Sequence, residues 1–262
     1  MPSTCTQSSP YIAAEKQVHQ KFGSRDPEIE MMLRGLLHEL RNPLSSILTA
    51  ATLLHDSPAP DTAEGDEESR MLLEVVKKES LRLNHILTEF AGYVKLPFPQ
   101  PHAFDLTNAA RASIARAQQE GVLPPGVAVV DELPEPCLVW ADESQIRMAL
   151  GHILKNAGEA MLSGGELRLS IEASETPQNV VLCIADSGQG FTSESRDRAF
   201  QPFYSDKNQS LGLGLSATRS LVEASQGRVW LDGARVEDDS DSTPARSDLP
   251  TRICLELPCD KP

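Results

Sequence analysis

The hydrophobic pattern of the chain changes at a proline-rich stretch, residues 97–101, and this change constrains the fold more than any other feature. Before the stretch, apolar residues recur with the helical period over two long segments. After it, short runs with strand-like alternation are mixed with further helical segments. Such a chain is expected to form a helical part followed by a separate part of mixed α and β structure.

The helical part is expected to be a hairpin. One helix is predicted for residues 27–55, an acidic loop for residues 61–67, and a second helix that ends before the prolines. Two helices alone enclose too little core, so two copies of the chain are expected to pair as a four-helix bundle. This reading assigns residues 1–26 to a flexible tail, residues 27–96 to the hairpin and residues 97–103 to a hinge.

The second part, residues 104–258, is expected to be an α+β sandwich with one mostly antiparallel sheet and helices on one face. Its short alternating runs are typical of half-buried strands, and its longer periodic runs are typical of helices packed on a sheet. The predicted strands are residues 104–106, 127–130, 138–140, 166–173, 180–185, 228–231 and 253–257, and the predicted helices are residues 107–120, 143–162 and 217–226.

Composition excludes several classes of protein. The formal net charge of the 262 residues is -14, which argues against a surface that binds nucleic acid. No apolar run approaches the ~20 residues needed to cross a bilayer, and the polar start is no signal peptide, so a cytoplasmic protein without a membrane span is expected. The five cysteines show no Cys-x-x-Cys spacing, so reduced, mostly structural thiols are expected.

The first candidate site is His38, which lies beside the apolar stripe of the first helix rather than within it. Glu39 is near enough to hold one ring nitrogen as N–H, which leaves the other nitrogen as a nucleophile. Asn42 follows on the same face of the helix. Pro43 cannot donate a hydrogen bond to the carbonyl of Glu39, so the helix is expected to bend or loosen there and expose the histidine.

The second candidate site lies on the helix predicted for residues 143–162. His152, Lys155, Asn156 and Glu159 form a polar stripe beside the buried one. The amide oxygen of Asn156 is a suitable ligand for Mg²⁺ that arrives with its own phosphate oxygens and waters, and Lys155 adds positive charge against phosphate. Taken alone, such a stripe is more often a solvated helix face.

A third candidate is Asp186, which ends an apolar strand and is followed by Gly188 and Gly190. A carboxylate in this position can accept a hydrogen bond from an exocyclic amine such as that of adenine. The two glycines allow the backbone to turn closely around a planar ring. The alternative for this motif alone is an ordinary turn between a strand and a helix.

The fourth candidate combines two stretches. Residues 199–207 place aromatic side chains around a proline, before a charged and flexible piece that contains Lys207. Gly212 and Gly214 then precede a helix, where backbone N–H groups and the helix dipole favour an anion. A lone Gly-x-Gly is a weak indication, whereas the polar stripe, the Asp186 stretch and these two stretches, in this order and spacing, are together a strong one.

Residues 38–44, His-Glu-Leu-Arg-Asn-Pro-Leu, resemble the H box of two-component sensor histidine kinases, most closely the nitrogen-regulation type. The later motifs resemble the N, G1, F and G2 boxes of the catalytic domain of that family, which shares the ATP-binding fold of gyrase. The resemblance implies an autophosphorylating kinase that passes the phosphoryl group from His38 to an aspartate of a response regulator. It makes Glu39 the partner of His38, and Asn42 the residue that positions water to dephosphorylate the regulator.

The same resemblance implies ATP and Mg²⁺ as cofactors. Asn156 would coordinate Mg²⁺, Asp186 would bind the adenine amine, and Lys207 would belong to a mobile ATP lid. The other residues implied to bind the nucleotide are Gly188 and Gly190 around the base, and Lys155, His152, Gly212, Gly214 and Leu215.

Two positions depart from the family pattern. His152 stands where kinases usually have a first asparagine and gyrase-type ATPases a water-activating glutamate, and Ser210 replaces a lid glycine. The missing glutamate favours a kinase over a free ATPase. An ATPase, a protein-serine kinase, and a degenerate scaffold or phosphatase-dominant homologue remain alternatives. The implied partners are a second copy of the chain and a response regulator receiver domain, with input from the tail, the bundle or a separate sensor protein.

Overall fold

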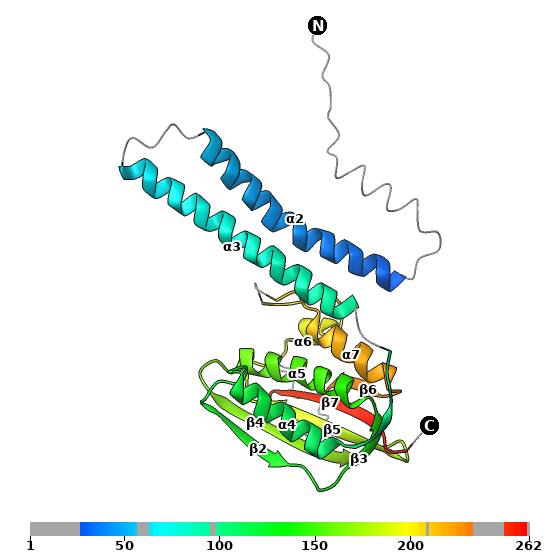
Figure 1. Cartoon of the computed structure of the whole chain (residues 1–262). Coiled ribbons are helices and arrows are strands. Elements are labelled where there is room, and N and C mark those ends of the chain that lie inside the picture. Colours follow the sequence, from blue (N-terminus) through cyan, green and yellow to red (C-terminus); the bar gives the residue numbers. More distant parts are fainter. Residues whose placement is uncertain (1–26, 57–62, 95–97, 208–209, 233–248, 261–262) are drawn as a thin grey trace.

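The computed structural model describes residues 27–56, 63–94, 98–207, 210–232 and 249–260. These residues form a long helical hairpin and a mixed α/β domain next to it (Figure 1). The predicted tail, residues 61–62 of the predicted acidic loop, and residue 97 of the predicted hinge lie outside the described residues.

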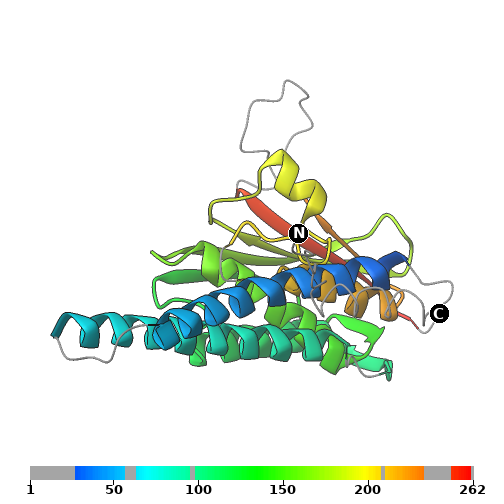
Figure 2. The same cartoon turned by 90° about the horizontal axis from the view of Figure 1, so that it is seen from above.

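The hairpin consists of two long antiparallel helices that lie side by side, α2 (Pro27–Asp56) and α3 (Ala63–Val94) (Figures 1 and 2). Since α3 already begins at Ala63, the prediction of a loop over residues 63–67 was wrong. Three of those five residues are acidic, and negative charge is favourable at the N-terminal end of a helix. Pro43 is buried and does not interrupt α2.

The α/β domain follows directly. Its elements are β1 (His102–Asp105), α4 (Leu106–Gln119), β2 (Val127–Glu132), β3 (Leu138–Ala141), α5 (Glu143–Ala160), β4 (Gly165–Ala173), β5 (Asn179–Asp186), α6 (Ser193–Arg198), α7 (Gly214–Ala224), β6 (Arg228–Leu231) and β7 (Thr251–Pro258). The short helix α6 was not predicted, and α7 begins three residues before its predicted start.

Five strands form one sheet in the order β2-β4-β5-β7-β6, with β2 parallel to β4 and the other neighbours antiparallel. The long helices α4, α5 and α7 lie on one face of this sheet (Figure 1). The predicted α+β sandwich is therefore confirmed. The prediction of a single sheet was wrong, because β1 and β3 pair with each other in a separate two-stranded sheet.

Aspartates at the ends of β1 and β3 start the helices that follow. Asp105 Oδ1 accepts a hydrogen bond from the N–H of Thr107 at 3.1 Å. Asp142 Oδ1 accepts from the N–H groups of Ser144 and Gln145 at 2.9 and 3.1 Å. Such caps satisfy N–H groups that have no partner within the helix. The cap at Asp142 thereby defines where α5 begins, and α5 carries the predicted polar stripe.

One hydrophobic core joins the sheet to the helices on its inner face, and burial of this apolar surface is the main force that holds the domain together. Its largest fully buried side chains are Leu106, Ile146, Leu150, Ile153, Leu154, Leu167, Leu169, Leu182, Ile184, Leu221 and Ile253. Because α5 contributes four of these residues, its opposite side is left for polar side chains.

A second, smaller hydrophobic cluster joins the hairpin to the α/β domain. Ile86 of α3 is only 1% exposed and packs with Leu211 and Leu213, which are each 4% exposed. A Cβ atom on Gly35 would lie 2.3 Å from Cδ2 of Phe203, so this glycine allows the aromatic ring to approach α2. We call this set the docking cluster; its members are Leu36, Leu40, Ile86, Phe90, Phe203, Leu211 and Leu213.

The outer face of the sheet holds a disulfide. Cys183 of β5 and Cys254 of β7 stand directly opposite each other, with their Cα atoms 4.2 Å apart, and are bonded. The two residues form a small cluster with Val181, and Trp230 packs against it. The expectation of reduced thiols was wrong for this pair, because 71 residues separate the two cysteines and only strand pairing brings them together. Cys137 and Cys259 are free thiols.

Reduction of the Cys183–Cys254 bond is expected to lower the thermal stability of the protein. The bond joins residues 71 apart, and in chain-entropy terms a crosslink over such a loop stabilises the folded state by about 4 kcal/mol. For a protein of this size, that free energy corresponds to a change in Tm on the order of 10 °C. Differential scanning calorimetry with and without a reductant measures the change.

Cys183→Ser should have a low Tm that the reductant does not change further. Cys259→Ser is the matched control, since Cys259 is not in the disulfide, and its Tm should still respond to the reductant. An oxidised wild-type protein whose Tm ignores the reductant would contradict the bond.

Candidate functional site

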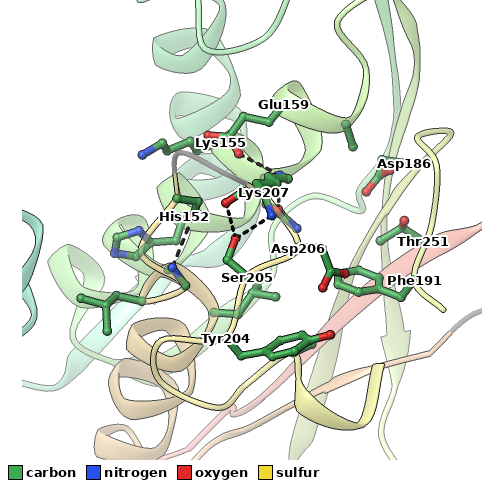
Figure 3. A pocket seen from close by; sticks show the side chains of 18 of the residues that line it. His152, Lys155, Glu159, Asp186, Phe191, Tyr204, Ser205, Asp206, Lys207 and Thr251 are labelled. Carbon is green, nitrogen blue, oxygen red and sulfur yellow. Dashed lines mark hydrogen bonds and ion pairs between the residues drawn. The ribbon is translucent and has the colours of Figure 1, made fainter. Parts of the chain in front are cut away.

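A pocket of about 360 Å³ lies between α5, the end of β5 and residues 204–207 and 210–215 (Figure 3). It brings together residues from all four predicted motifs of the α/β domain, which are the polar stripe of α5, the stretch at Asp186, residues 199–207 and the glycine stretch before α7. The predicted residues that line it are His152, Lys155, Asn156, Asp186, Gly190, Lys207, Gly212, Gly214 and Leu215. Gly188 lies beside the pocket rather than in its lining.

Asp186 is a buried carboxylate at the end of β5, only 4% exposed. Its Oδ1 atom accepts a hydrogen bond from the N–H of Gly188 at 2.9 Å. Burial raises the pKa of the Asp186 carboxyl, while hydrogen bonds from Gly188 and the Thr251 hydroxyl, and the charge of Lys207, act to lower it. A buried acceptor in a pocket that Phe191 also lines is suited to a planar base with an exocyclic amine.

Gly188 is required by close packing. A Cβ atom there would lie 2.6 Å from the Cβ of Ala160 and 2.7 Å from Oδ1 of Asp186. Any side chain would therefore displace the Asp186 carboxylate or the end of α5. The glycine acts on the site through Asp186 and not as part of the wall.

The oxygen that was predicted to bind metal, Asn156 Oδ1, already accepts a hydrogen bond from a lysine. Lys207 Nζ donates to Asn156 Oδ1 at 2.7 Å and lies 2.7 Å from Glu159 Oε2 (Figure 3). Within the described residues, no group of three or more His, Cys, Asp or Glu side chains could hold a metal ion. A divalent cation at Asn156 would therefore take most of its ligands from bound phosphate and water.

His152 is a partly buried neutral base at the rim of the pocket. Burial lowers its pKa, the charge of Lys155 lowers the pKa further, and Glu89 opposes both. The neutral imidazole can thus offer a lone pair or one N–H group, without adding positive charge to the pocket near pH 7.

The end of the pocket near α7 is shaped for an anion. Gly212 has a φ of +66°, and a Cβ atom there would lie 2.1 Å from the carbonyl oxygen of Tyr204, so only glycine fits. Leu213, which precedes α7, makes no side-chain capping hydrogen bond. The first N–H groups of α7 are consequently available to phosphate oxygens.

The three predicted residues of α2 lie outside this pocket. His38 is 71% exposed, and its Nδ1 atom lies 3.7 Å from Glu39 Oε1. The other carboxylate oxygen of Glu39 lies 3.6 Å from Arg82 of α3. Asn42 is exposed. The expected neighbourhood of histidine and carboxylate is present, and the exposed ring is accessible to another molecule or domain.

Several residues near these sites were not predicted. Thr251 reaches Asp186 because β7 pairs with β5 in that register, and Glu89 enters the pocket from the hairpin. Arg82 reaches Glu39 because α3 packs against α2. Phe191 and Tyr204 also line the pocket. A contact between distant segments leaves no local motif, so the sequence offered no pattern for Thr251, Glu89 or Arg82.

Two family models match the chain, one on each side of the proline-rich stretch. The model described as His Kinase A (phospho-acceptor) domain matches residues 28–96. The model described as Histidine kinase-, DNA gyrase B-, and HSP90-like ATPase matches residues 141–261. The first match ends at residue 96, directly before the proline-rich stretch.

Known proteins resemble both parts together. The chain is 27% identical over 233 residues to Sporulation kinase E of Bacillus subtilis, an alignment that covers 84% of this chain and 29% of that protein. It is 30% identical over 198 residues to Sensor histidine kinase ZraS of Escherichia coli, covering 74% and 40%. The chain thus spans less than half the length of these curated relatives.

The fold is similar to that of histidine kinase ThkA in its crystal structure with response regulator protein TrrA. The TM-score is 0.58 at 20% sequence identity, with 97% of this chain and 68% of that chain covered. In the described part of the chain, every helix is too short or too polar to cross a lipid bilayer.

Asp186→Asn is expected to raise the Tm at pH 8. The raised pKa means that ionised Asp186 costs folding free energy, and this cost is present above the pKa of the folded state. The wild-type protein regains this stability as the pH falls through that pKa, so the advantage of the variant should shrink from pH 8 towards pH 4. Thermal melts across this range measure the difference.

The Asn side chain keeps an oxygen that can accept from Gly188 and Thr251, so the variant removes the charge and little else. A lower Tm for Asp186→Asn at every pH would contradict the burial argument.

Proposed function

Because this chain has the catalytic core of a sensor histidine kinase, we propose that it transfers the γ-phosphoryl group of ATP to His38, and then to an aspartate on the receiver domain of a response regulator. The observation that carries the proposal is the combination of two sites in one chain. An exposed histidine with a carboxylate neighbour stands on a hairpin, and a pocket with a buried acceptor and an anion-binding helix end stands in the next domain.

In this proposal the pocket orients ATP by holding the base at one end and the phosphates at the other. The Asp186 carboxylate accepts a hydrogen bond from the adenine amine, and Thr251 and Gly188 hold that carboxylate in place. The phosphates lie against Gly212, Gly214, Leu215 and the first turn of α7, with Lys155 and His152 on the facing side. Such positioning supplies most of the catalysis in phosphoryl transfer.

Asn156 is the proposed protein ligand of Mg²⁺. Its Oδ1 atom already accepts a hydrogen bond from the Lys207 ammonium at 2.7 Å, so the oxygen is directed at a site that holds positive charge. When bound, Mg²⁺ would neutralise charge on the phosphate oxygens. Lys207 would then release Asn156 and contact phosphate itself, as a residue of the lid.

The proposed chemistry at His38 follows from the orientation of its ring. Nδ1 faces Glu39, so Nε2 attacks the γ-phosphorus, the bond to the β–γ bridging oxygen breaks, and ADP leaves. Glu39 then stabilises the proton on Nδ1 and takes it up as the product forms. Arg82 lies near the far oxygen of Glu39 and restrains that carboxylate.

The proposed second reaction is with the response regulator. Asn42 follows His38 by one helical turn and is exposed, and we assign it to orienting the water that dephosphorylates the receiver aspartate. The seven residues at 38–44 and the short lid, residues 205–210, favour the nitrogen-regulation type of kinase. Use of ATP favours a cytoplasmic location for the core.

The hairpin supports a homodimer. Much of its apolar surface has no cover within one chain, and such a surface normally marks an interface. Two hairpins would cover it as a four-helix bundle. The exposed large apolar residues of the hairpin are Leu37, Leu44, Leu48, Leu53, Met71, Leu73, Val75, Leu81 and Leu87.

A degenerate or phosphatase-dominant homologue is the second candidate, and His152 and Ser210 are the observations that favour it. Measurable ATP binding without label on the protein would support it. A dephosphorylation assay on an acetyl-phosphate-labelled receiver would then distinguish a phosphatase-dominant homologue from a degenerate one, since only the phosphatase is sensitive to Asn42→Ala.

His38→Gln is expected to abolish autophosphorylation and leave ATP affinity unchanged, because His38 lies outside the pocket. The measurement is incubation with γ-labelled ATP and Mg²⁺, followed by acid and base treatment of the product. Label on the wild type should be acid-labile and base-stable.

His55→Gln is the matched control, since His55 is exposed on the same helix, and it should label normally. Label on His38→Gln would refute the phosphoacceptor assignment, and acid-stable label would point to a protein-serine kinase.

The double variant Leu48→Glu and Leu81→Glu is expected to be monomeric, because these side chains are 69% and 62% exposed in one chain and charge there opposes an apolar interface. Light scattering after size exclusion should give twice the chain mass of 28.5 kDa for the wild type. Leu162→Glu, at a position 78% exposed in the α/β domain, should remain dimeric. A monomeric wild type would overturn the proposed bundle.

A further inference from the structure

The pocket contains a carboxylate that belongs to the other domain. Glu89 of α3 lines the pocket, and its Oε1 atom lies 3.0 Å from Lys155 Nζ. The end of α3 lies over the α/β domain in both views (Figures 1 and 2). The hairpin therefore supplies an anionic partner to a lysine that faces the nucleotide pocket.

The position of Glu89 is supported on several sides. Ile86, one turn earlier on α3, is buried in the docking cluster against Leu211 and Leu213. His85 Nε2 lies 3.3 Å from the same Oε1 atom of Glu89. Because the docking cluster seats this turn of α3 against the residues that precede α7, the carboxylate stays next to the phosphate end of the pocket.

A carboxylate and a phosphate compete for the same lysine. Both present anionic oxygens that bind an ammonium group at similar distances. The second lysine in the pocket, Lys207, is held in a comparable way by Glu159, but Glu159 belongs to the same domain. Of these two lysine contacts, the one between Lys155 and Glu89 depends on where the hairpin lies.

We propose that Glu89 is a phosphate surrogate, which occupies Lys155 when the hairpin is docked and must leave it when the phosphates of a nucleotide bind. Docking of the hairpin and binding of the phosphates then oppose each other, and each weakens the other by the same factor. The base end of the pocket is expected to be unaffected, since Gly188, Thr251 and Lys207, which interact with Asp186, all belong to the α/β domain. This inference rests on the proposed use of ATP by the pocket.

The test compares ATP with adenosine, which lacks the phosphates. In the full chain, Glu89→Gln should tighten ATP binding by about two- to fivefold, as expected for loss of one partly exposed competing charge. The Kd of adenosine should not change. Isothermal titration calorimetry measures both, at low ionic strength where the effect is largest.

Two further variants isolate the contact. Glu74→Gln removes the same charge from an exposed position on α3 and should leave the Kd of ATP at the wild-type value. Glu89→Asp keeps the charge on a shorter side chain and should also tighten ATP binding. It serves as the test if Glu89→Gln folds poorly. In a Lys155→Gln background, Glu89→Gln should have no effect on the Kd of ATP.

Equal changes in the affinities of ATP and adenosine would overturn the surrogate role, as would an effect that persists without Lys155. An unchanged Kd in Glu89→Gln, together with normal labelling of His38, would overturn this inference alone. A wild-type chain that binds neither ATP nor adenosine would overturn the proposed function along with it.

Discussion

The antiparallel register of β5 and β7 is the constraint on which most of this structure depends. It sets Asp186 opposite Thr251 at one end and Cys183 opposite Cys254 three positions further along. Side chains three residues apart on a strand point to opposite faces. The same pairing therefore directs a carboxylate into the pocket and a disulfide to the outer face. There the disulfide joins the two strands that carry the end of the site proposed to bind the base.

The two lysines of the pocket already have partners within the protein. Lys155 contacts Glu89, and Lys207 contacts Asn156 and Glu159. Binding of phosphate would thus exchange one set of ion pairs for another, and the net free energy is the small difference between them. Small movements of the hairpin or the lid then change affinity appreciably, which suits a protein whose proposed nucleotide site and proposed phosphoacceptor lie in different domains.

Much of the fold and of the candidate site was predictable, because local sequence patterns indicate these features. The two helices of the hairpin and the α+β sandwich follow from periodicity. Nine of the ten residues predicted for the nucleotide site, all but Gly188, line the pocket, and they come from short motifs around Asn156, Asp186 and Gly212. The failures share a cause. The separate sheet of β1 and β3, the early start of α3 and the disulfide depend on pairing or on helix-end electrostatics that hydrophobic period does not record.

The sequence by itself determined which residues have the chemistry: an imidazole beside a carboxylate at His38, a neutral amide at Asn156, an acid at the end of an apolar strand at Asp186. These are properties of residue type and of nearest neighbours along one element. Only the tertiary structure decided that Glu89 meets Lys155 and that Arg82 meets Glu39, because each contact joins two elements whose relative position is set by packing. The residues on a helix face do not specify which element will pack against it, since the hydrophobic effect is non-directional.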